Sequence, residues 1–294
     1  MSKKEFKTIG EQVEILKNRG LNIANEEEAK DFLFKNNYYR VSGYTLTLRS
    51  NDVFFPNKNL SNIKDIYYFD KFLRHNLLVL ISEIETTVKA IYAYRFCEKY
   101  NPYAYLDSSL FTDIEKYESI IEKVENQKEQ VKSFELCVKH FIEKKEEFPF
   151  WAYIELFTFG NMSQFFSISH IDLKKLIAAD FGFTMNKGAR HFETSLRVIT
   201  TLRNLCAHGS RLYNRRFISK PSLNKEDQKY LRSYVDGTQD NDHLFAFLLA
   251  IKRIVSKDSF NFFIKEFKAL HKAYPTVHLT KYGFPNQWVK IFSK

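Results

Sequence analysis

Apolar residues recur along the chain mainly at alternating spacings of three and four, which is the pattern of amphipathic helices. The longest such run occupies residues 62–100. A capping-box spacing from Asn62 to Asp65 marks its start. Asn101 before Pro102 marks its end, because a residue that precedes proline avoids the helical region. The pattern therefore predicts one long amphipathic helix.

Shorter helices are predicted on both sides of this run. A helix at 8–19, closed by Gly20, precedes a second one that a capping box of Asn25 and Glu28 opens. The lysine- and glutamate-rich segment 113–147 predicts one or two exposed helices with a turn near Asn126. Further helices are predicted at 172–179, 189–207, 241–255 and 258–272.

Two segments depart from this pattern. Residues 38–50 alternate apolar and polar positions after Gly43, which predicts a strand or extended arm able to pair with residues 53–55. Residues 148–166 are so densely aromatic that they must be buried against the long helix or a partner subunit, with Gly160 and Asn161 ending one helix.

The composition agrees with an all-α fold, since the 294 residues include only nine Gly and six Pro. We expect three sections. Residues 1–60 form an N-terminal helical pair with an extended arm, residues 61–220 a helical core, and residues 221–294 a C-terminal helical extension.

A formal net charge of +10 favours polyanionic partners, although many basic proteins bind no nucleic acid. The local distribution is more informative, because residues 190–220 contain seven Lys or Arg and one acidic residue, Glu193. We expect an RNA-binding surface from the basic residues of this segment, which include Arg197, Arg211, Arg215, Arg216 and Lys220.

Several classes of protein are poorly supported. The three cysteines, Cys97, Cys137 and Cys206, form no C-x-x-C pair, which argues against a disulfide framework or a zinc site and favours a reducing cytoplasm. The N-terminus lacks the apolar region of a signal peptide, and no apolar run is long enough for a membrane span. Walker, G-x-G-x-x-G, H-E-x-x-H and G-x-S-x-G motifs are absent from the sequence.

The candidate chemistry lies in LRNLCAHGSRLYNRR at 202–216, where a predicted helix meets Gly209. Asn204 and His208, four residues apart, share a face of this helix, and Arg203 lies about 100° round from Asn204. One chain offers half a site. Two such helices facing across a two-fold axis would bring both histidines and both arginines together, so we expect a homodimer.

These residue types suit RNA cleavage by the ribose 2′-OH, which needs a proton acceptor, a proton donor and a cation for the phosphate. His208 can transfer protons near neutral pH, and Arg203 can grip the non-bridging oxygens. The simpler interpretation is that Arg203 pairs with a carboxylate and His208 caps its own helix. Spacing alone favours that simpler interpretation.

Two residues of the long helix are candidates for a supporting role. Arg74 and Glu85 are eleven residues apart and lie within about 20° of one face, so Glu85 is placed to orient Arg203. The alternative, which we favour at this point, is an exposed charged stripe, since Asp70 and Lys89 each stand four residues from an opposite charge.

RNLCAH at 203–208 resembles the R-x4-6-H signature of HEPN ribonucleases, with Asn after Arg. The order of several longer segments resembles the Abi-like (AbiD/AbiF-type) abortive-infection family over nearly the whole chain. These segments are EQVEILKNRGL at 11–21, NNYYRVSGY at 36–44, YYFDKFLRHNLLVLISEIE at 67–85, WAYIELFTFGNMS at 151–163, CAHGSRLYNRR at 206–216 and YGFPNQW at 282–288.

This resemblance implies a HEPN-type helical bundle and a toxin-like, anti-phage endoribonuclease that forms a 2′,3′-cyclic phosphate. It implies no metal and no other cofactor, in line with the lack of any clustered carboxylate or Cys/His site in the sequence. Arg203 and His208 carry the family's catalytic positions, with Asn204 beside them, and Arg211 and Asn214 extend the set. A small structured RNA is the implied restraining partner.

Other interpretations remain open. A non-catalytic HEPN protein would hold RNA on its basic surface while His208 supports the fold. A protein interaction module would use the aromatic segment 148–166 for docking, with little salt dependence. DNA binding through the N-terminal helix pair is weaker, because that pair has no clearly basic recognition helix.

Overall fold

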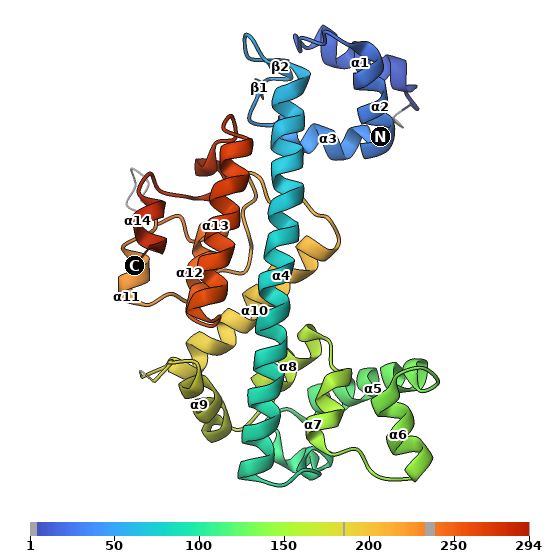
Figure 1. Ribbon diagram of the computed structural model, residues 1–294, viewed down its shortest axis with the longest axis vertical. Coiled ribbons are helices and arrows are strands. Elements are labelled where there is room, and N and C mark those ends of the chain that lie inside the picture. The colour runs from blue at the N-terminus through green and yellow to red at the C-terminus, as the bar shows by residue number, and fades with distance from the viewer. Residues whose placement is uncertain (1–4, 185, 233–238, 294) are drawn as a thin grey trace.

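The structure is a computed structural model that describes residues 5–184, 186–232 and 239–293. The first four residues, part of the N-terminal sequence considered above, lie outside this description, as does the side chain of Cys137. The fold is all-α, as predicted (Figure 1). No described helix combines the length and the apolar character needed to cross a membrane.

Helix α4 (Leu60–Lys99) runs the length of the molecule and organises the other elements (Figure 1). Its 40 residues correspond to about 60 Å. Asn59 is the N-cap and forms a capping box with Asn62, so the helix begins three residues earlier than the Asn62–Asp65 spacing predicted. The predicted end before Pro102 is confirmed.

The N-terminal section surrounds the start of α4 (Figure 1). The two predicted helices are confirmed, with caps from Thr8 and Asn25. The prediction of an extended arm from residue 38 is wrong, because Tyr38–Thr45 is helical and buries Val41 and Tyr44 in the core. Only the tip of the arm pairs as predicted. The elements are α1 (Ile9–Asn18), α2 (Glu26–Asn36), α3 (Tyr38–Thr45), β1 (Arg49–Ser50) and β2 (Val53–Phe54).

The opposite end of α4 carries a second group of helices. The turn predicted near Asn126 lies further on, at 132–135, because α5 continues through Val131. Gly160 and Asn161 do not end a helix but lie in the first turn of one that Thr158 caps. The elements are η1 (Ala104–Leu106), η2 (Ser108–Leu110), α5 (Ile114–Val131), α6 (Leu136–Lys144), α7 (Phe150–Tyr153), η3 (Ile154–Leu156) and α8 (Phe159–Ile168).

The aromatic segment 148–166 is buried against α4, as predicted. Phe150 packs on Tyr92 and Phe96 with ring centroids 5.6 Å and 4.5 Å apart. Its rings are core residues rather than a docking surface, although Trp151 is 55% exposed.

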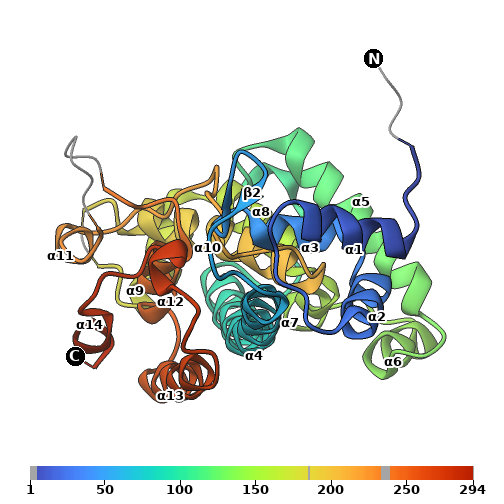
Figure 2. The same cartoon turned by 90° about the horizontal axis from the view of Figure 1, so that it is seen from above.

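The remaining helices complete the core around the second half of the chain. Helix α10 crosses α4 and packs against α8, α9 and α12, while α13 lies along α4 (Figures 1 and 2). The predicted helices of this part are confirmed, with ends shifted by a few residues. The elements are α9 (Ile171–Asp180), α10 (Gly188–Ala207), α11 (Lys225–Gln228), α12 (Leu244–Lys252), α13 (Lys257–Ala273), η4 (Leu279–Tyr282) and α14 (Trp288–Phe292).

Candidate functional site

The candidate catalytic residues lie at the C-terminal end of α10, where the helix stops as predicted. His208 is the C-cap, and Gly209 adopts the left-handed conformation with φ of +63°. The N–H groups of Gly209 and Ser210 donate to the carbonyls of Cys206 and Leu205 at 3.0 and 2.8 Å. This is the Schellman arrangement, which satisfies the free carbonyls of the last turn.

The two faces of this helix end differ sharply. Asn204 and His208 are exposed, and Arg203 is half-buried, with its Nη1 3.4 Å from the Asn204 side-chain oxygen. Leu202 and Cys206 point into the core. Burial raises the pKa of the Cys206 thiol to about 12, so this cysteine is not a nucleophile despite its place in the motif. The polar face is therefore what the helix end offers to a ligand.

A single buried carboxylate, Asp70 of α4, holds the chain that follows His208. It accepts hydrogen bonds from the main-chain N–H groups of Leu212, at 3.1 Å, and Tyr213, at 2.8 Å. The hydroxyls of Tyr44 and Tyr282 donate to it at 2.8 and 2.9 Å. Such charge-assisted bonds are the strong ones in a buried setting. We call residues 209–214 the motif loop.

Arg74 lies beside Asp70 and balances its negative charge. We call Asp70, Arg74, Tyr44 and Tyr282 the Asp70 cluster. Its guanidinium pairs with Asp70 and donates to the Tyr44 hydroxyl at 3.2 Å. Burial is the largest effect on the pKa of Arg74 and would lower it, but the charge of Asp70 and the contacts with Tyr44 together raise that pKa above its usual value. Burial, aided by the same carboxylate, raises the pKa of Tyr44 and Tyr282. Both tyrosines therefore remain protonated donors.

These observations correct the interpretation of the charges on α4. The exposed stripe is wrong, since Asp70 is fully buried and Arg74 and Lys89 are only 6% and 7% exposed. Glu85 lies 3.7 Å from the Lys89 ammonium, and no ion pair joins it to Arg203 within the described residues. Arg74 instead pairs with Asp70, which holds the motif loop, and it also interacts electrostatically with Cys206 of the motif.

The N-terminal section also contacts the motif loop. Arg40 of α3 donates to the carbonyl of Gly209, next to His208. A methyl group at Gly209 would displace the end of the Arg40 side chain, but it is the left-handed backbone with φ of +63° that favours glycine at this position. Thr47 and Tyr213 share a hydroxyl hydrogen bond of 2.8 Å. The loop is thus held from two sides.

The predicted RNA-binding residues are either simply exposed or held by contacts within the protein. Arg197 is exposed on α10. The guanidinium of Arg211 donates to the carbonyls of Tyr213 and Asn214, and that of Arg215 donates to the Arg211 carbonyl at 3.1 Å. Asn214 itself has φ of +51°. Arg216 and Lys220 lie 3.9 and 3.6 Å from the Asp242 carboxylate. Several of these side chains therefore also have structural partners.

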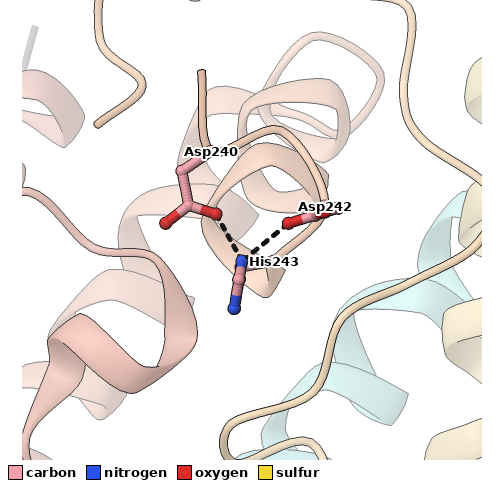
Figure 3. Close-up of side chains that lie close together, drawn as sticks. All are labelled: Asp240, Asp242 and His243. Atoms are coloured by element: carbon pink, nitrogen blue, oxygen red, sulfur yellow. Dashed lines mark ion pairs between the residues drawn. The ribbon is translucent and has the colours of Figure 1, made fainter. Parts of the chain in front are cut away.

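A cluster of two carboxylates and a histidine that was not predicted from the sequence lies beside Arg216 and Lys220. Asp240, Asp242 and His243 each offer one possible ligand atom, and these atoms lie within 4.8 Å of one another (Figure 3). The expectation that the chain has no clustered carboxylate and histidine groups is therefore wrong. The signal was the local sequence Asp-Asn-Asp-His at 240–243. The His243 ring lies close to both carboxylates, and the Arg232 guanidinium lies 3.9 Å from Asp240.

Comparison with known proteins identifies the family. The family described as Abi-like protein matches residues 31–214, which is more than half of the chain and includes both Asp70 and the motif. This chain belongs to the Abi-like family. Membership suggests a role in abortive-infection defence. No curated protein and no solved structure matches the chain significantly.

Proposed function

We propose that this protein is a HEPN-type endoribonuclease that acts in abortive infection and cleaves RNA without a metal ion. The observation that carries the proposal is the placement of Asn204 and His208 on the exposed end of α10, with Arg203 beside them. The Asp70 cluster supports it, because a positioned catalytic group needs a rigid backbone.

The reaction uses only proton transfers and one displacement at phosphorus. A histidine removes the proton of the ribose 2′-OH, and the oxygen attacks the adjacent phosphorus. The bond from phosphorus to the 5′ oxygen breaks, and that oxygen takes a proton from a second donor. The products are a 2′,3′-cyclic phosphate and a 5′-hydroxyl end. Arg203 stabilises the negative charge on the non-bridging oxygens.

One chain supplies one histidine to the motif, whereas the reaction needs both a base and an acid. We propose that a second copy provides the other His208 across a two-fold axis. The exposure of the α10 end leaves it accessible for such an arrangement. We further propose that a small structured RNA restrains the enzyme until infection, as the family resemblance in the sequence implies.

The test is to incubate the wild type, His208→Ala and Arg203→Ala with total cellular RNA in EDTA and to map the cleavage ends. We expect cyclic-phosphate ends from the wild type, with cleavage lowered about a hundred- to ten-thousand-fold in His208→Ala. His140→Ala, which removes an exposed histidine outside the basic segment 190–220, serves as the matched control.

Two outcomes would reject this assignment. Equal cleavage by His208→Ala, Arg203→Ala and the wild type would remove the motif from the chemistry. Tight RNA binding without cleavage by the wild type, retained in His208→Ala, would favour the non-catalytic RNA-binding alternative.

A further inference from the structure

A cavity of about 370 Å³ opens where the three sections of the chain meet. Its walls come from the β1–β2 hairpin, the start of α4, the motif loop and the segment around η4. Phe55 and Lys58 line it from the hairpin side, Tyr213 from the motif loop, and His278 and Lys281 from the C-terminal segment. It is separate from the exposed face of Asn204 and His208, neither of which lines it.

Apart from the Tyr213 phenol, the ionisable side chains that line this cavity are all basic. No carboxylate lines it, whereas two lysines and a histidine do. Among the described residues, the ammonium groups of Lys58 and Lys281 and the ring of His278 make no ion pair or hydrogen bond. The acid closest in sequence to the lining, Asp65, accepts a 2.8 Å hydrogen bond from the Thr276 hydroxyl. Two unpaired cations in one recess favour an anion.

The cavity is also larger than a phosphate needs. Phe55 is 44% exposed beside the two lysines, and Leu48 adds a second apolar wall. Exposed aromatic rings stack on nucleobases, and lysines bind phosphates as point charges. A volume of this size lies at the lower end of the range for small-ligand sites.

From this combination we propose that the cavity binds a nucleotide, with its phosphate between Lys58 and Lys281 and its base against Phe55. The inference goes beyond the proposed cleavage, since it uses neither Arg203 nor His208. The site adjoins the motif loop directly. Tyr213 forms part of its wall, and the N–H of Asn214 donates to the Lys281 carbonyl at 3.0 Å.

Isothermal titration of the full chain with the four ribonucleoside 5′-monophosphates and the matching nucleosides tests the proposal. We expect at least one monophosphate to bind tenfold or more tightly than its nucleoside. Lys58→Ala and Lys281→Ala should each weaken that binding about tenfold. Lys290→Ala, which removes an exposed lysine of α14, is the matched control and should bind normally. Lys58→Arg keeps the charge and should bind within a few-fold of the wild type.

The source of the nucleotide is distinguished by a second titration of His208→Ala, which leaves RNA intact under the proposed mechanism. Tighter binding of a 5′-phosphorylated trinucleotide than of the monophosphate assigns the cavity to an RNA end, and weaker or equal binding assigns it to a free nucleotide. The proposal is overturned if no monophosphate binds better than its nucleoside, or if Lys290→Ala weakens binding as much as the cavity variants. Neither result depends on whether the protein cleaves RNA.

Discussion

The carboxylate of Asp70 accepts a 2.8 Å hydrogen bond from the main-chain N–H of Tyr213, although 143 residues separate them. Because Tyr213 follows His208 by five positions, this bond links the first quarter of the sequence to the backbone beside the proposed catalytic residue. The bond defines a cluster whose energetic role can be measured.

The Asp70–Arg74 pair should be costly to break from one side. We expect Asp70→Ala to lower the free energy of unfolding by about 3–5 kcal/mol, because Arg74 would keep a buried charge without its partner. The double variant Asp70→Leu with Arg74→Met should lose less than Asp70→Ala alone. Urea denaturation measures both. Asp31→Asn, at an exposed position, is the control. A loss no larger than the control's would show that the pair contributes little.

A side chain at Gly209 should lower stability. Its φ of +63° makes Gly209→Ala unfavourable by about 1–2 kcal/mol. Gly10→Ala is the matched control, because Gly10 lies in helix α1 and a methyl group there would meet nothing within 4 Å. Denaturant unfolding should show a loss only for Gly209→Ala. Equal stability of both variants would mean that the loop relaxes freely.

Arg197 and Arg211 should respond differently to removal. Arg197 is exposed, so Arg197→Ala should weaken RNA binding and reduce the slope of log K against log salt by about 0.7 for each lost phosphate contact. Arg211 holds main-chain carbonyls, so Arg211→Ala should lower stability and leave the salt slope unchanged. Filter binding at several salt concentrations, with a thermal unfolding scan, separates the two effects. The reverse pattern would assign RNA contact to Arg211 instead.

Alkaline pH should weaken the Asp70 cluster. Burial raises the pKa of Tyr282 well above the value of 10.0 that it has in the unfolded chain. Its contribution is therefore fully present below pH 10 and is lost as the pH rises above that value, because only the unfolded state releases the proton. Between pH 9 and 11 the wild type should lose about 1.4 kcal/mol more than Tyr282→Phe. Urea denaturation at both pH values tests this, and parallel losses would contradict it.

The helical framework could be predicted from the sequence because each long helix carries its own apolar stripe and end signals. The end of α10 is an example, because Gly209, next to the motif, predicts the helix end that the Schellman arrangement forms. The long helix α4 could be predicted from its sequence in the same way. Its start was misplaced by three residues only because Asn59 and Asn62 stand at the same spacing as Asn62 and Asp65.

The environment of the candidate site was less predictable. Opposite charges four residues apart look alike on an exposed stripe and in a core, and the burial of Asp70 depends on Tyr44 and Tyr282, far away in the sequence. Helix α3 was missed because Gly43 interrupts the helical pattern and Tyr44, Leu46 and Leu48 alternate with threonines directly afterwards, although Val41 and Tyr44 are both buried. The roles of Arg203, Asn204 and His208 themselves stay predictions until activity is measured.

The long reach of the Asp70 cluster has a consequence for synthesis of the protein. Chains grow from the N-terminus, so His208 leaves the ribosome well before Tyr282, whose hydroxyl closes the cluster at 2.9 Å. A nascent chain that has emerged only as far as the motif has Asp70 and Tyr44 but not this last donor. The support for the motif loop is thus completed only after the segment that contains Tyr282 has followed the motif out of the exit tunnel.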